Sequence, residues 1–312
     1  MSKIAFLFPG QGSQSVGMGL DFHQEYDIVR ELFDMAEELT KIHLSKLCFK
    51  GPMEDLTATV NLQPAVTTVN LAALAVIQKE GLVPDISAGH SLGEYSALAA
   101  AEVLSREDTI RLVHRRGILI HREATRHQGA MHAIVGLPID TIEALCERHR
   151  NQGVVSVANH NMETQIVISG EPQAVEAVSG QAADQGARAV PLNVSGAWHS
   201  ELIRGADGEF RDYLATMAFT DPSSPVVHNV TARESDGPDQ IRSLMADQLC
   251  SPVRWFDAMC HLVDRKVDTF VEVGPGKVLT GLLRKIVPSD YDCRWFNVNS
   301  MKTFEKFMNS VS

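Results

Sequence analysis

Hydrophobic and polar positions along the chain predict short, fully buried strands separated by amphipathic helices. Residues 4–8 are continuously apolar, as in a strand buried on both faces of a parallel sheet. A second apolar stretch over 82–89 ends in a Gly-rich turn, and good helix formers follow over 92–101. Further strands of this kind are predicted at 225–230 and 269–273. Strands that alternate with helices indicate an α/β fold with a parallel sheet.

Turn residues and apolar spacing define the helices that precede the second of these strands. Residues 21–47 are predicted to be helical, up to a break at Gly51-Pro52. Gln63-Pro64 begins the next helix, with the proline in the first turn, where its missing N–H is tolerated, and Gly81 ends it. The apolar residues expected to share one face of this helix are Val66, Val69, Ala73, Leu74 and Ile77.

The segment from 130 to 195 has a different order of predicted strands and helices from the rest of the chain. Its elements follow the order β-α-β-β-α-β, which is that of a ferredoxin-like unit. The predicted ranges are 131–137, 138–150, 154–158, 165–169, 171–186 and 187–194. We therefore predict an α/β-hydrolase-like large subdomain with a parallel sheet, formed by 1–128 and 198–312. A ferredoxin-like small subdomain at 129–197 is inserted into it.

Ser91 lies at the apex of the Gly-rich turn after the second strand. Gly89 and Gly93, two residues to either side, allow strand and helix to approach closely, and the helix start supplies free N–H groups near the hydroxyl. A serine between glycines is often a plain turn. The strand before it and the helix after it favour a nucleophile instead.

The first strand also ends in a Gly-rich loop, at residues 8–14. This loop is either a tight turn or a cradle of N–H groups for an anion. The third glycine and the downstream acidic residue of a dinucleotide site are missing, so NAD binding is excluded.

Plotted at about 100° per residue, the helix at 106–126 places Arg116 in the middle of its apolar face. A guanidinium on an inward face needs an anionic partner. The residues alone favour an internal salt bridge, and a bound substrate carboxylate is the alternative. A different face carries a basic stripe of Arg111, Arg115, Arg122 and Arg126.

His199 follows the inserted unit at its junction with the larger part. Clefts between domains are favoured places for sites. One histidine among 12 is usually not catalytic, so its position alone makes His199 no more than a candidate.

The composition narrows the class of protein. A formal net charge of -11 argues against nucleic-acid and membrane-surface binding, and no apolar run approaches the roughly 20 residues of a membrane span. The N-terminal apolar run is too short for a secretory signal. The five cysteines are odd in number and unpaired in spacing, which fits free thiols in a reducing cytoplasm, and the histidines show no metal-binding spacing.

Taken together, these stretches resemble malonyl-CoA:acyl carrier protein transacylases nearly from end to end. The markers are FPGQGSQ at 8–14, Gln63-Pro64, GHSLGEY at 89–95, Arg116-Gly117, His199-Ser200, Gln248 with Pro252 and Trp255, and EVGPG at 272–276. The resemblance implies a cytoplasmic acyltransferase that binds no cofactor. It would transfer malonyl from malonyl-CoA to the phosphopantetheine thiol of acyl carrier protein through a malonyl-serine ester, for fatty acid biosynthesis, with polyketide biosynthesis left open.

The resemblance also implies a role for each site residue. Ser91 would carry the acyl group, His199 would be its general base and acid, and Gln248 would orient His199 through its backbone carbonyl. The N–H groups of Gln11 and Leu92 would form the oxyanion hole. Arg116 would clamp the malonyl carboxylate instead of forming a salt bridge, and Gln63 and Asn159 would line the pocket.

Trp198 departs from the family pattern, in which a smaller aromatic residue or a serine is common at this position. In related polyketide acyltransferases the position helps to sort unbranched from branched extender units. A bulky indole should crowd an α-methyl group and so favour malonyl over methylmalonyl.

Two rival functions remain open on the sequence. A thioesterase or esterase would release free malonate without a carrier, and a non-catalytic carrier-binding subunit would not need Ser91, His199 or Arg116. No carboxylate stands out between Ser91 and His199 for the acidic member of a hydrolase triad. Because carriers of this kind are acidic, docking needs a local basic patch, for which the arginine stripe is the first candidate. Lys277, Arg284 and Lys285 are the second.

Overall fold

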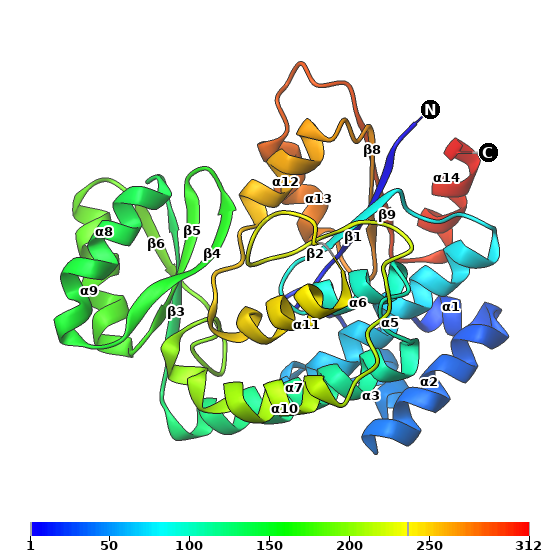
Figure 1. Ribbon diagram of the computed structural model, residues 1–312, viewed down its shortest axis with the longest axis horizontal. Helices are drawn as coiled ribbons and strands as arrows, with labels where there is room; N and C mark the ends of the chain where they lie inside the picture. Colours follow the sequence, from blue (N-terminus) through cyan, green and yellow to red (C-terminus); the bar gives the residue numbers. More distant parts are fainter. Residues whose placement is uncertain (1, 236, 312) are drawn as a thin grey trace.

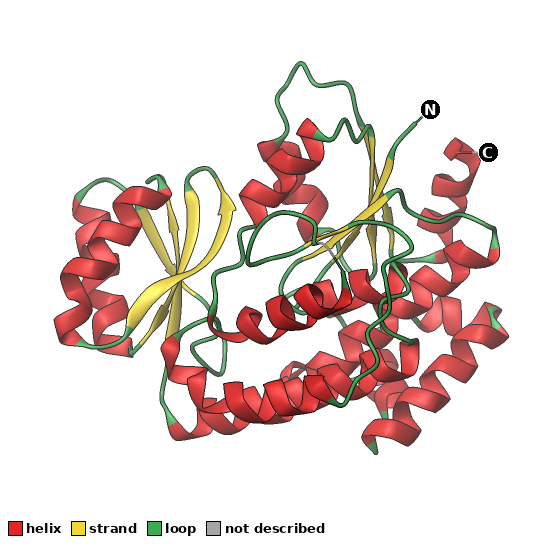
Figure 2. Ribbon diagram, viewed as in Figure 1, coloured by secondary structure: helices red, strands yellow, loops and turns green. Residues whose placement is uncertain are grey.

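Two sheets organise the chain in the computed structural model, which describes residues 2–235 and 237–311 (Figures 1 and 2). Sheet A has five parallel strands in the order β7-β2-β1-β8-β9. Their bounds are β1 (Ile4–Phe8), β2 (Ile86–Gly89), β7 (Val226–Val227), β8 (Thr269–Val273) and β9 (Arg294–Val298). Alternate residues of β1 enter different clusters: Phe6 and Phe8 join the largest core, whereas Ala5 and Leu7 join a second core. The strand is thus buried on both faces, as its continuous apolar sequence predicts.

Helices cover both faces of sheet A (Figure 2). They are α1 (Leu20–Glu25), α2 (Asp27–Thr40), α3 (Leu44–Lys50), α4 (Met53–Thr57), α5 (Thr59–Lys79), α6 (Gly93–Ala100), α7 (Arg106–Arg126), α10 (Asp207–Ala215), α11 (Pro238–Asp247), α12 (Trp255–Asp264), α13 (Val278–Ile286) and α14 (Met301–Val311), with the 3₁₀ turns η2 (Glu201–Ala206) and η3 (Gln248–Cys250). The second core lies between the sheet and helices α12 and α13, and helices α2, α5 and α7 contribute to the largest core.

Sheet B is antiparallel, with the strand order β4-β5-β3-β6. Its strands are β3 (Ala130–Val135), β4 (Val155–Met162), β5 (Gln165–Gly170) and β6 (Arg188–Pro191), and its helices are α8 (Ile139–His149) and α9 (Pro172–Asp184), with the 3₁₀ turn η1 (Arg150–Gln152). Ile166 and Ile168 pack in the core with α8 and α9, whereas Val167 belongs to the largest core. The predicted α/β fold with an inserted ferredoxin-like unit is confirmed, and its boundaries at 129 and 197 stay a prediction.

Helix α5 begins earlier than the sequence predicted. The expected start at Gln63-Pro64 is wrong, because the helix begins at Thr59 and Pro64 lies in its second turn. Near a helix end, the missing N–H of Pro64 removes only one hydrogen bond, and tertiary packing overrides this local signal. Residues 62–77 are all buried, so the apolar surface is not confined to one face. The helix is long enough to cross a bilayer, but 89% of its apolar window is buried inside the protein, as in a core helix.

Other departures also come from tertiary contacts. The predicted helix at 21–47 is divided at Tyr26, which is extended, and at Lys41, which has a left-handed φ of 60°. The predicted strand at 225–230 is cut to β7, because the chain then turns toward the back of the Ser91 turn. Strand β9 and helices α4, α10 and α12 were not predicted. The tail forms α14, and its Phe307 ring lies 5.3 Å from that of Phe296 on β9.

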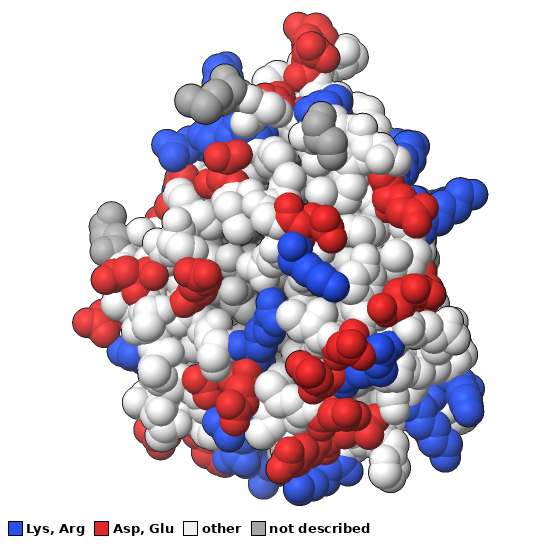
Figure 3. Space-filling view, turned by 90° about the vertical axis from the view of Figure 1, so that its right-hand side faces the viewer, with Lys and Arg blue, Asp and Glu red and all other residues white. Residues whose placement is uncertain are grey.

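Charges of both signs are mixed on the surface. Figure 3 shows acidic and basic side chains interspersed over one face of the molecule. The basic stripe on α7 is also neutralised locally. Arg111 pairs with Glu107 and Asp108, Arg115 and Arg122 pair with Glu209, and Arg122 and Arg126 pair with Glu123. The stripe is therefore a solvated helix face whose charges already have partners.

Candidate active site

Ser91 occupies a strained turn between β2 and α6. Its φ of 50° is unusual for a residue other than glycine. An added Cβ would lie 2.0 Å from the Gly93 carbonyl carbon at position 89, and 1.9 Å from the Phe8 carbonyl oxygen at position 93, so both positions require glycine. The Asn229 amide holds the turn from behind, since it accepts from the Ser91 N–H and donates to the Gly89 carbonyl, both at 2.7 Å.

His199 lies against the Ser91 hydroxyl. Its Nε2 is 2.8 Å from Ser91 Oγ, and its Nδ1 is 3.0 Å from the Gln248 carbonyl oxygen. Because a carbonyl only accepts, Nδ1 carries the proton and Nε2 is free to accept the hydroxyl proton. Burial, and next the Arg116 cation, lower the pKa of His199 to about 3. The imidazole is therefore neutral at pH 7 and can act as a base.

Two backbone N–H groups border the Ser91 turn. An added Cβ on Gly10 would lie 2.4 Å from the His90 carbonyl oxygen and 3.4 Å from the Leu92 nitrogen, so the loop before Gln11 packs directly on the start of α6. Neither the Gln11 nor the Leu92 N–H donates a hydrogen bond within residues 2–235 and 237–311. The N-terminal end of α6 favours negative charge at this place. Both groups are thus available to an oxyanion.

Arg116 is buried without an acidic partner. Its side chain is 4% exposed, and no carboxylate among the described residues lies within ion-pair distance. It donates to Gln63 Oε1 at 2.7 Å, to Ser91 Oγ at 3.3 Å and to Gln248 Oε1 at 3.4 Å. The internal salt bridge that the residues alone favoured is wrong. A desolvated cation with only neutral acceptors is a site for an anion.

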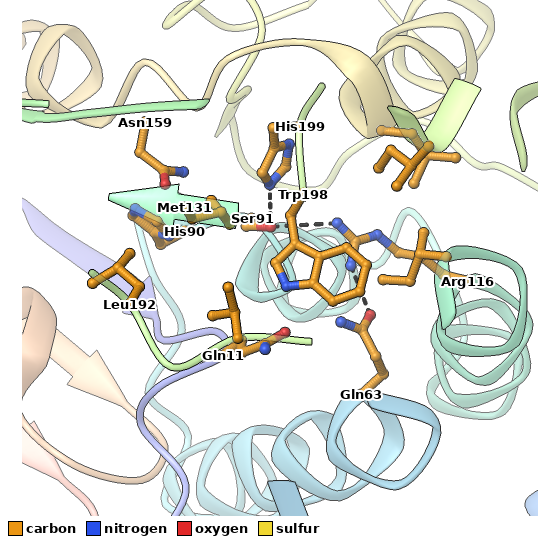
Figure 4. A pocket seen from close by; sticks show the side chains of 14 residues that line it. Gln11, Gln63, His90, Ser91, Arg116, Met131, Asn159, Leu192, Trp198 and His199 are labelled. Carbon is orange, nitrogen blue, oxygen red and sulfur yellow. Dashed lines mark hydrogen bonds between the residues drawn. The ribbon is translucent and has the colours of Figure 1, made fainter. Parts of the chain in front are cut away.

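These groups face one cavity (Figure 4). Its volume of about 120 Å³ well exceeds the roughly 10–15 Å³ that one water needs, so it has room for a small acyl group. The candidate residues that line it are Gln11, Gln63, Ser91, Arg116, Asn159, Trp198 and His199. Leu92 and Gln248 are fully buried and are not among its lining residues. The Trp198 indole stands in front of Ser91, and its N–H has no partner among the described residues.

Sequence reasoning missed several polar residues around the site. His90 lines the cavity, and its Nε2 lies 2.8 Å from Asn161 Oδ1. Glu94 and His228 are buried behind Ser91 as a pair. Only their proximity to Ser91 in the sequence could have indicated His90 and Glu94. No local signal marks the others, since they approach through the fold.

The part of the chain that the structure describes holds no cluster of three or more His, Cys, Asp or Glu side chains suited to a metal ion. All five cysteines are free.

Comparisons with known proteins agree on one family. The model of the acyl transferase domain matches residues 5–302. A protein of Bacillus subtilis (strain 168) named malonyl CoA-acyl carrier protein transacylase is 43% identical over 288 residues, which cover 92% of this chain and 91% of the relative. An acyl carrier protein S-malonyltransferase structure from Vibrio cholerae has a TM-score of 0.93 at 39% identity, covering 98% of this chain and 100% of that one. A malonyl-transacylase in complex with a type II PKS acyl carrier protein has a TM-score of 0.94 at 36% identity, covering 99% and 100%.

Proposed function

This chain belongs to the acyl transferase family and, within it, to the malonyl-CoA:acyl carrier protein transacylases, and we propose that it moves malonyl from malonyl-CoA to the phosphopantetheine thiol of an acyl carrier protein. One observation carries the proposal: the unpaired Arg116 guanidinium lies 3.3 Å from Ser91 Oγ. A nucleophile and a receptor for a free carboxylate thus share one cavity. The product would supply extender units for fatty acid biosynthesis. Polyketide biosynthesis is the alternative pathway, because one structural relative is in complex with a type II PKS acyl carrier protein.

The first half-reaction loads Ser91. His199 accepts the hydroxyl proton while Ser91 Oγ attacks the thioester carbonyl. The N–H groups of Gln11 and Leu92 stabilise the oxyanion, and loss of one such donor typically costs about 10²–10³ in rate. When the intermediate collapses, His199 gives its proton to the departing coenzyme A thiolate, and malonyl remains on Ser91 as an ester. Arg116 holds the malonyl carboxylate, Gln63 and Asn159 line the acyl pocket, and Trp198 excludes an α-methyl group.

The second half-reaction runs in reverse with a new thiol. The phosphopantetheine thiol gives its proton to His199 and attacks the ester carbonyl, and Ser91 recovers its proton as it leaves. His199 is oriented by the neutral Gln248 carbonyl, which stabilises imidazolium less than a carboxylate would. A thiol needs less activation than water, so this arrangement favours transfer over hydrolysis. No cofactor takes part, and the free cysteines suit the cytoplasm as the location.

The carrier would approach the basic residues around α13. Lys277, Arg284 and Lys285 have no acidic partner among the described residues, in contrast to the arginine stripe on α7. Arg284 lies over the Trp295 ring, at 5.3 Å from its centroid. Helix α13 also lines a pocket that shares Gln11, His90 and Asn159 with the active-site cavity. We therefore favour this second basic set as the docking surface for an acidic carrier.

Mass spectrometry after exposure to malonyl-CoA tests the function directly. We expect the intact protein to gain one malonyl group, to retain it in buffer, and to lose it to holo acyl carrier protein. The peptide that contains Ser91 should carry the modification. Rapid appearance of free malonate without a carrier would instead identify a hydrolase. A protein that is never acylated would be a non-catalytic binding subunit.

The pH dependence of Ser91 reactivity tests the state of His199. Because the pKa of His199 is lowered to about 3, its base form persists from pH 8 down to pH 5. The rate of Ser91 modification by a neutral fluorophosphonate should therefore stay level over that range. Arg116 lowers this pKa, so Arg116→Ala should raise the pKa of His199. The fall in the modification rate on acidification should then begin at a higher pH. A wild-type modification rate that falls with a midpoint near pH 6.5, the ordinary pKa of histidine, would contradict this account.

A further inference from the structure

Glu94 is a buried carboxylate for which the transfer described above has no role. It lies on α6, in the first turn after Ser91, and its side chain is 1% exposed. One carboxylate oxygen accepts a hydrogen bond from Gln248 Nε2 at 2.6 Å, and the other lies 2.8 Å from His228 Nδ1. His228 is fully buried, and its Nε2 lies 3.0 Å from Ser235 Oγ. A buried carboxylate without such partners would cost several kcal/mol.

Gln248 connects this pair to the reacting groups. Its backbone carbonyl accepts from His199, and its side-chain Nε2 also donates to the Ser91 carbonyl at 3.0 Å. Its side-chain Oε1 accepts from Tyr95 Oη at 3.3 Å and from Arg116 at 3.4 Å. One residue thus contacts the base through its main chain and the Arg116 guanidinium through its side chain.

The charges of Glu94 and Arg116 decide which way the Gln248 amide points. An ionised carboxylate only accepts hydrogen bonds, and a guanidinium only donates them. The NH₂ end must therefore face Glu94, and the oxygen must face Arg116. Reversal would place two acceptors together on one side and two donors together on the other. Both contacts are buried, so water cannot relieve the mismatch.

We propose that Glu94, held in place by His228, is a positioning residue for malonyl transfer: it fixes the Gln248 amide so that Oε1 holds the Arg116 guanidinium beside Ser91. Glu94 touches neither the substrate nor the reacting atoms, and it acts through Gln248. This inference rests on the proposed function, since it concerns how Arg116 is presented to the malonyl carboxylate.

The variant Glu94→Gln tests this role, because it keeps the size of the side chain and removes its charge. An amide at position 94 can donate or accept, so the Gln248 amide loses its charged acceptor and is held less firmly, by the Ser91 carbonyl and Arg116. We expect the ratio of kcat/KM for malonyl-CoA to that for acetyl-CoA to fall at least about fivefold. Acetyl transfer should change less, because acetyl has no carboxylate for Arg116 to hold.

Glu272→Gln is the matched control. Glu272 is equally buried, but it accepts from the backbone N–H groups of Leu279 and Thr280, outside the catalytic network. This variant should lose thermal stability and keep the wild-type malonyl-to-acetyl ratio. If Glu94→Gln does not fold, Glu94→Asp replaces it, since Asp keeps the charge but withdraws the carboxylate from Gln248, and the ratio should again fall.

The outcomes separate this inference from the proposed function. A folded Glu94 variant with the wild-type ratio, whether or not both rates are reduced, would show a merely structural role and overturn the inference. An equal fall in the Glu272→Gln ratio would overturn it as well. Failure of the proposed function would be visible in the same assay, because the wild-type protein would then show no malonyl transfer to the carrier.

Discussion

Replacing Ser91 with alanine is expected to abolish the malonyl-enzyme and to lower kcat for malonyl transfer by about 10⁴ or more. The reason is that the cavity offers no second nucleophile. None of the residues that line it is a cysteine or a lysine, and of its two histidines His199 lies against Ser91 Oγ whereas His90 pairs with Asn161. The oxyanion donors and Arg116 would remain, so malonyl-CoA should still bind. The measurement is intact-protein mass spectrometry combined with carrier malonylation kinetics.

Ser96→Ala is the matched control for this prediction. Ser96 is a fully buried serine on α6, the helix that follows Ser91, and its hydroxyl accepts a hydrogen bond from Asn70. Its loss should cost about 1 kcal/mol of folding free energy and leave the malonyl-enzyme intact. Stable malonylation of Ser91→Ala at any other residue would show that the nucleophile has been misassigned.

The local part of the site could be predicted from the sequence because it depends on backbone geometry. The strand, turn and helix around Ser91 follow from apolar spacing and from two glycines, and the structure shows why no other residue fits at those positions. The inward direction of Arg116 follows from helical periodicity in the same way. Both features need only neighbours within a few residues.

The partners of these residues could not be predicted, since they come from distant segments. Periodicity shows that Arg116 points inward, but it cannot show whether a carboxylate faces it, and the salt bridge favoured on that basis is absent from the described residues. From the sequence alone, His199 was a candidate only because it lies at the junction between the inserted unit and the larger subdomain. The Glu94 contact with His228 joins positions 134 residues apart, and no local pattern reports such a contact.

The predicted boundaries of two elements were wrong for a related reason. Pro64 is a strong local signal for a helix start, yet α5 is buried along nearly its whole length and extends past it. The two-residue strand β7 ends early because Asn229 is used to hold the Ser91 turn. In both places a tertiary contact outweighed the local preference of the backbone.

Arg116→Ala is expected to leave Ser91 open to acylation but to remove the preference for malonyl-CoA over acetyl-CoA. A bidentate guanidinium–carboxylate pair contributes about 1.5–3 kcal/mol, which corresponds to a loss of roughly ten- to a hundredfold in relative kcat/KM. The loss should fall mainly on malonyl, because acetyl has no carboxylate for the guanidinium to hold, whereas loss of the Arg116 contact with Ser91 Oγ affects both thioesters. The measurement is kcat/KM for both thioesters with the same carrier.

Two further variants separate charge from geometry in this prediction. Arg116→Lys keeps the positive charge but loses the planar fork, so it should restore only part of the malonyl preference. Arg122→Ala removes an ion-paired arginine from an exposed face of the same helix and should keep the wild-type ratio. An unchanged malonyl-to-acetyl ratio in Arg116→Ala would exclude the carboxylate clamp. The desolvated cation would then need another anion to account for its burial without an acidic partner.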